Sequence, residues 1–92
     1  MNVKLLRIEP QPAAAGADMD VRVLVEIDGA EEWHFLRVEP NVLPGVDASL
    51  VVASDALQNR LRPVQPALHR ICRLVGCEQR GQRVHLPEWI AA

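Results

Sequence analysis

Residues 19–38, MDVRVLVEIDGAEEWHFLRV, decide the fold of this chain. Up to the pair Asp28-Gly29, apolar side chains alternate with mostly polar ones, which is the period-two pattern of a strand with one buried face. Asp-Gly favours the tight type I′ turn that joins two antiparallel strands. The segment after it, residues 32–38, is rich in aromatic and branched side chains, as strands are. The stretch therefore predicts a β-hairpin with strands over residues 19–27 and 32–38.

Two more segments favour strands. Residues 3–8, VKLLRI, form a short apolar run that Glu9-Pro10 closes, because proline cannot donate a hydrogen bond to a sheet. LRIEP at residues 6–10 and LRVEP at residues 36–40 then share a role, a strand that ends at a proline. Residues 11–17, QPAAAGA, have no periodicity and are expected to form a loop. Near the C-terminus, Val84 and Leu86 alternate with polar neighbours and predict a last short strand, followed by an apolar tail in which Trp89 fills the core.

A helical period appears after a turn expected over residues 41–46, centred on Pro44-Gly45. With Asp47 as its N-cap, a first helix would place Leu50, Leu57 and Leu61 on one face. Val51-Val52 favours a strand instead, so the alternative is a short helix that starts at Ser54. Both versions end before Pro63.

A second helix is predicted from Pro66, which suits a first helical turn, to Gly76, which suits a C-cap. Its apolar side chains recur at helical spacing and mark the face that should be buried: Leu68, Ile71, Cys72 and Val75.

The predicted order is β-β-β-α-α-β, an α+β fold with a small antiparallel sheet and two helices packed on one of its faces. The 92 residues suffice for a single domain over 1–92. Within it, residues 1–40 are the strand-rich acidic part with the hairpin, residues 47–76 hold the two helices, and residues 82–90 hold the short strand and apolar tail.

Composition excludes several classes. Hydrophobic residues make up 49% and charged residues 24%, as in globular domains and unlike disordered chains. No apolar stretch approaches the roughly 20 residues that span a bilayer. The N-terminal residues lack the apolar block of a signal peptide. With two cysteines, the chain is not a disulfide scaffold, so we expect a reduced, cytoplasmic protein with no membrane partner.

Charge is divided unevenly along the chain. Residues 1–56 hold four basic side chains against ten carboxylates, and residues 57–92 hold six arginines against two glutamates. Such a split suits either binding of a polyanion or association of acidic with basic surfaces. The candidate basic surface comprises Arg60, Arg62, Arg70, Arg73, Arg80 and Arg83.

A nucleic-acid interface would use these arginines as phosphate contacts. Against it stand the net charge of −2, the absence of tyrosine and the absence of aromatic residues between the arginines as stacking platforms. The connection between the two predicted helices contains Pro63 and Pro66, unlike the short turn of a DNA-binding helix-turn-helix. Nucleic-acid binding is therefore the second hypothesis.

Catalysis finds little support. Ser49 and Ser54, the two serines, suit helix starts better than nucleophiles. The chain has no G-x-S-x-G, phosphate loop, dinucleotide fingerprint or H-E-x-x-H. We therefore expect a protein that is not an enzyme and has no cofactor.

Zinc is the third hypothesis. Cysteine and histidine are zinc ligands, and His69, Cys72, Cys77 and His85 lie within 17 residues. Four residues separate the cysteines, which is wider than the usual knuckle, and the His85 spacing fits no standard finger. We expect no metal at these candidates, and Cys72 suits a buried position on the second helix.

The interaction hypothesis ranks first. Trp33, His34 and Phe35 lie on a hairpin strand, and Leu24 interrupts the otherwise polar face of the neighbouring strand. An exposed tryptophan there would anchor a contact. The sequence thus predicts a small non-catalytic interaction or accessory module whose partner is a protein or itself, with a homodimer expected.

Overall fold

The structure, a computed structural model, describes residues 1–10, 21–40 and 49–91. Five strands form one sheet in the order β4-β3-β2-β1-β5, and each neighbouring pair is antiparallel. The strands are β1 (Val3–Pro10), β2 (Val21–Ile27), β3 (Ala30–Pro40), β4 (Ser49–Ala53) and β5 (Glu88–Ala91). The helical elements are α1 (Asp55–Arg60), the 3-10 turn η2 (Arg62–Val64) and α2 (Gln65–Gln79).

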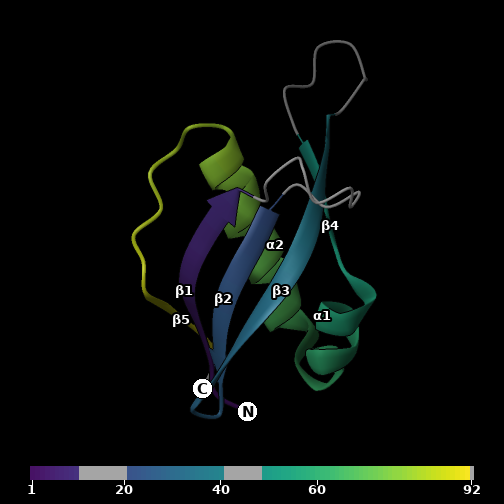
Figure 1. Cartoon of the computed structure of the whole chain (residues 1–92), viewed down its shortest axis with the longest axis vertical. Coiled ribbons are helices and arrows are strands. Elements are labelled where there is room, and N and C mark those ends of the chain that lie inside the picture. The colour runs from purple at the N-terminus through teal and green to yellow at the C-terminus, as the bar shows by residue number, and fades with distance from the viewer. Residues whose placement is uncertain (11–20, 41–48, 92) are drawn as a thin grey trace.

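The sheet has one face that α2 covers. In Figure 1, β1, β2 and β3 lie in front and α2 crosses behind them, with α1 beside β3 and β4. This arrangement confirms the predicted α+β fold with helices packed on one side of an antiparallel sheet. None of the described helices is both long and apolar enough to cross a bilayer.

The hairpin of β2 and β3 is confirmed. Ile27 pairs with Ala30 across the turn, where Asp28 has φ 49° and Gly29 has φ 89°. Positive φ at both central residues is what a type I′ turn requires. The turn is also tied to Asn2, the residue before β1: the Asn2 backbone N–H donates to Asp28 Oδ1 at 2.8 Å, and the Asp28 N–H donates to the Asn2 carbonyl at 2.9 Å.

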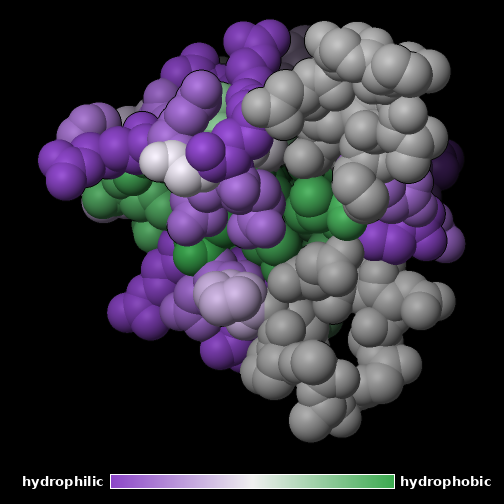
Figure 2. Space-filling view, turned by 90° about the horizontal axis from the view of Figure 1, so that it is seen from above, coloured by the Kyte–Doolittle hydropathy of each residue, from purple (hydrophilic) through white to green (hydrophobic). Residues whose placement is uncertain are grey.

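Alternation along β2 decides which face is buried. Buried and partly exposed side chains alternate along the whole strand, so that every second side chain enters the core. Seen along the strands in Figure 2, hydrophobic residues form a band between hydrophilic ones. The core draws on every strand of the β1–β4 part of the sheet and on both α-helices: Val3, Leu5, Val21, Val23, Val25, Ile27, Leu36, Ala53, Leu57, Leu61, Ala67, Leu68, Ile71 and Val75.

The helix predicted to run from Asp47 is wrong over residues 49–53, which form the edge strand β4. The branched pair Val51-Val52 decides for a strand, because β3 continues past the hairpin and offers its backbone for pairing. The alternative was correct: Ser54 is the N-cap of α1, and its Oγ accepts a hydrogen bond from the Leu57 N–H at 3.3 Å. Asp47 and the turn at 41–46 lie outside the described residues.

The second helix is longer than predicted. α2 begins with Pro66 in its first turn and continues past Gly76 to Gln79, so the C-cap is Arg80. Gly76 is buried inside the helix, where a Cβ would lie 3.6 Å from Val51 Cγ2 of β4. Gly81, with φ 79°, follows the helix end instead. Gly76 therefore packs against β4 and does not end the helix.

The C-terminal prediction was wrong in two respects. Residues 82–85 are irregular, and β5 comes later, at Glu88–Ala91, where it pairs with β1. Trp89 does not fill the core, since it is 57% exposed.

The prediction that β1 and β3 each end at a proline is confirmed at Pro10 and Pro40. The predicted loop at 11–17 and the start of β2 at residue 19 fall outside the described residues.

Candidate interaction surface

The face of the sheet opposite α2 carries exposed aromatic side chains. Strand register places Leu24 beside Trp33, and Phe35 follows two residues later on the same face of β3. Trp33 is 41% exposed and Phe35 is 36% exposed, although apolar side chains of this size are usually buried. We call this surface the outer face.

Cations lie over two of its rings. The Arg22 guanidinium carbon is 4.5 Å from the centroid of Trp33, and Lys4 Nζ is 5.0 Å from the centroid of Trp89. Arg22 is also held by Glu9 on β1, since its Nη2 donates to Glu9 Oε1 at 2.8 Å. These contacts fix the rings without covering them, because both tryptophans keep more than 40% of their surface exposed.

Val52 extends the apolar part of the outer face to the sheet edge. It pairs with Arg37 on β3, which points away from the core as Phe35 does, whereas the neighbouring Val51 faces Gly76 of α2. Val52 is half-buried. The apolar surface therefore runs from β2 across β3 to β4.

Charges around this apolar surface are balanced. Register places two cations and two carboxylates near its ends on β2 and β3: Arg22, Glu26, Glu31 and Arg37. Several of the charges also pair within the chain. Arg37 Nε, for example, lies 2.9 Å from Glu39 Oε1, which is an ion-pair distance although the contact does not make a hydrogen bond. The outer face therefore has an apolar centre and a rim of both signs, the composition of many protein interfaces.

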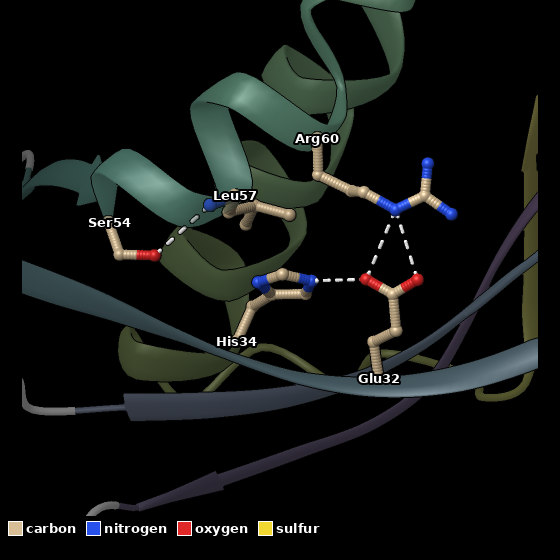
Figure 3. A network of polar contacts seen from close by, with 5 residues as sticks. All are labelled: Glu32, His34, Ser54, Leu57 and Arg60. Carbon is tan, nitrogen blue, oxygen red and sulfur yellow. Dashed lines mark hydrogen bonds and ion pairs between the residues drawn. The ribbon is translucent and has the colours of Figure 1, made fainter.

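His34 does not share this face. It points toward the helices and is only 8% exposed, so the structure separates it from Trp33 and Phe35. Figure 3 shows it in a polar cluster with Glu32 and Arg60. His34 Nε2 lies 2.9 Å from Glu32 Oε1, and Arg60 Nε lies 3.0 Å from Glu32 Oε2.

This cluster joins β3 to α1. The hydrogen bond from His34 is the largest influence that lowers the pKa of Glu32, and Arg60 lowers it further, while burial acts in the opposite direction. A histidine beside a carboxylate also occurs in hydrolases, but there a nucleophile must be held against the histidine. The Ser54 Oγ in Figure 3 instead caps α1. The cluster therefore links α1 to the sheet.

The six arginines of the predicted basic surface have different partners and neighbours. Arg60 binds Glu32, Arg70 binds Glu88 of β5, and Arg62 Nη2 donates to Asn59 Oδ1 at 2.7 Å. Arg73 and Arg80 line one shallow hollow beside Gly76, and Arg83 lines another. These arginines are thus distributed over α1, η2, α2 and the segment that follows α2.

The four zinc candidates are also separated. Cys77 and His85 line a hollow of about 410 Å³ between α2 and residues 82–88, whereas His69 and Cys72 are not among its lining residues. Within residues 1–10, 21–40 and 49–91, no three histidine, cysteine or carboxylate side chains gather as a metal site would require. Both cysteines are free thiols, and burial raises the pKa of Cys72.

Sequence reasoning missed Arg22, Val52 and Trp89 as parts of the outer face. The position of Arg22 could have been predicted from the sequence, because a two-residue turn at Asp28-Gly29 fixes the hairpin register and hence which residues share a face. Val52 depended on recognising β4, and Trp89 on placing β5 beside β1.

Comparison of the chain with protein families, curated proteins and solved structures finds no match. The outer face therefore has to be interpreted from its own geometry.

Proposed function

We propose that this protein is a non-catalytic interaction module of the cytoplasm that binds a protein, with itself as the expected partner, through the outer face. The observation that carries the proposal is the exposure of Trp33 and Phe35 side by side on a sheet face that the helices leave uncovered. Tryptophan is among the residues that contribute most to binding when an interface buries it.

Nucleic acid is the less favoured ligand. Aromatic rings on an open sheet can stack bases, but here carboxylates such as Glu26 and Glu31 lie beside the rings and would repel phosphates. The outer-face cations Arg22 and Arg37 only balance these carboxylates, and the arginines of the predicted basic surface lie on other elements. Balanced charge around an apolar centre suits a protein surface better.

Site-specific photo-crosslinking tests the proposal. Phe35 is replaced by p-benzoylphenylalanine, a phenylalanine analogue that bonds covalently to a protein in contact with it, and the cells that produce the variant are irradiated. We expect a discrete protein adduct. A matched variant carries the same group at Arg70, which is exposed on α2, and should give none.

Adding Trp33→Ala to the Phe35 variant should abolish the adduct and leave the circular dichroism spectrum unchanged, because Trp33 packs outside the core. If position 35 gives no adduct, or position 70 gives the same one, the outer face is not the interaction surface. Loss of the folded spectrum in Trp33→Ala would make Trp33 a structural residue instead.

A further inference from the structure

We infer that the outer face binds a second copy of this chain in a two-fold symmetric dimer, whose axis lies in the interface between the two sheets and runs perpendicular to β3, midway between Trp33 and Phe35. The inference rests on the proposed function, since it uses the same surface.

The apolar centre is contiguous. Leu24 pairs directly with Trp33, Phe35 is the next residue of β3 on that face, and Val52 pairs with Arg37 one step further along β3. Neighbouring strands are about 4.8 Å apart, and residues i and i+2 are about 6.7 Å apart along a strand. At these spacings the four apolar side chains form one patch over three strands.

The outer residues of β3 are self-complementary. They read Glu31, Trp33, Phe35, Arg37, which is acid, aromatic, aromatic, base. A two-fold axis across the strand reverses this order in the second copy. Trp33 then faces Phe35 of the second copy, and Glu31 faces Arg37 of the second copy. Because the interface is isologous, each of these contacts occurs twice.

Both charged residues are available for such contacts. Glu31 is exposed, and 41% of the Arg37 side chain is exposed although it lies near Glu39. An ion pair at such a solvent-accessible site contributes little to stability, so Arg37 can be shared with an incoming carboxylate at small cost. Packed sheets cross at about 30°, and long side chains such as glutamate and arginine accommodate the displacement.

A second copy fits this pattern better than a purely acidic or purely basic partner. A purely acidic or basic partner would meet like charges at one end of β3, where Glu31 and Arg37 differ in sign. A reversed copy presents the opposite sign at both ends.

Charge reversal tests the register. Glu31→Arg and Arg37→Glu are made singly and together in the full chain, and the dimer dissociation constant is measured by sedimentation equilibrium at low salt. Each single variant places like charges at both contacts and should weaken the dimer by roughly tenfold or more. The double variant should regain affinity close to that of the wild type.

Mixing the two single variants gives a second, independent readout. Neither variant should dimerise well alone, but an equimolar mixture should form a heterodimer, since both of its contacts again join opposite charges. The matched control reverses Glu78, an exposed carboxylate on α2, and should leave the dissociation constant unchanged.

The possible failures are distinguishable. A wild-type chain that is monomeric at about 100 µM, or a crosslinked adduct from position 35 whose mass is not twice that of the chain, overturns the second copy and leaves the proposed function standing. A dimer that Trp33→Ala weakens but the charge reversals do not overturns the two-fold register alone. A dimer insensitive to both overturns the register and the proposed surface together.

Discussion

Glu32 shows how one side chain couples two elements. Its carboxylate accepts from His34 on its own strand and from Arg60 on α1, and it keeps 28% of its side-chain surface exposed. Removing one partner of such a cluster leaves polar groups of the nearly buried His34 without their contact, which costs more than the contact contributes.

The depressed pKa of Glu32, caused first by the hydrogen bond from His34 and then by Arg60, predicts a pH dependence. A carboxyl whose pKa is lower in the folded state stabilises that state above its unfolded pKa, about 4.3 for glutamate, and the contribution disappears as the pH falls through the folded value. The difference in unfolding free energy between wild type and Glu32→Gln should therefore be largest near pH 7 and shrink below about pH 4.3.

Urea denaturation at several pH values measures this difference. Glu78→Gln, which removes an exposed carboxylate from α2, is the matched control for the loss of one charge. A gap between wild type and Glu32→Gln that stays constant from pH 7 to pH 3 would contradict the role assigned to the cluster.

Helix α2 packs against strand β4 at Gly76, so a substitution there tests how closely the two elements approach each other. A Cβ at position 76 would lie 3.5 Å from Arg80 Nη1 and 3.6 Å from Val51 Cγ2, both ordinary van der Waals distances. The backbone there is helical, without the positive φ found at Gly81. The site therefore has room for a methyl group and for nothing much larger.

Gly76→Ala should stabilise the fold by about 0.5–1 kcal/mol, because alanine loses less backbone entropy than glycine in a helix. Gly81→Ala is the contrasting variant and should destabilise, since φ at residue 81 is 79°. The shift of the urea midpoint at constant m-value measures both effects. Destabilisation by Gly76→Ala would mean that α2 and β4 cannot separate even slightly.

At the scale of the whole molecule, one side of the sheet is closed by helices and the other bears exposed rings. The acidic and basic halves of the sequence meet partly within the chain, as Arg60 and Glu32 do. This internal neutralisation removes one reason to expect a polyanion as partner.

Folding of the whole chain also lowers the reactivity of the Cys72 thiol. Cys72 is half-buried on α2, and burial raises its pKa, so fewer molecules carry the reactive thiolate at neutral pH. In a Cys77→Ser background, alkylation of Cys72 by iodoacetamide at pH 8 should be several-fold slower in the native protein than in urea. Equal rates would show that the native thiol is neither shielded nor perturbed.

Much of the fold followed from local pattern. Strict alternation around Asp28-Gly29 was enough to place the hairpin and its buried face, because period-two side-chain direction and turn chemistry are properties of the chain itself. The apolar face of α2 followed from spacing in the same way. The secondary structure of residues 49–53 and 82–90 was harder to predict, since a short apolar run is compatible with more than one local structure. Whether such a run forms a strand also depends on a neighbouring strand with which it can pair.

For the candidate site, too, some features follow from the sequence and others only from the tertiary structure. Sequence alone determined that Leu24, Trp33 and Phe35 lie together on one side of a hairpin. Only the tertiary structure decided that the helices cover the other side, that His34 lies there with Glu32 and Arg60, and that Trp89 remains outside the core. The physical reason is that exposure and ion pairing depend on elements distant in sequence, and their docking is settled by how the whole core packs.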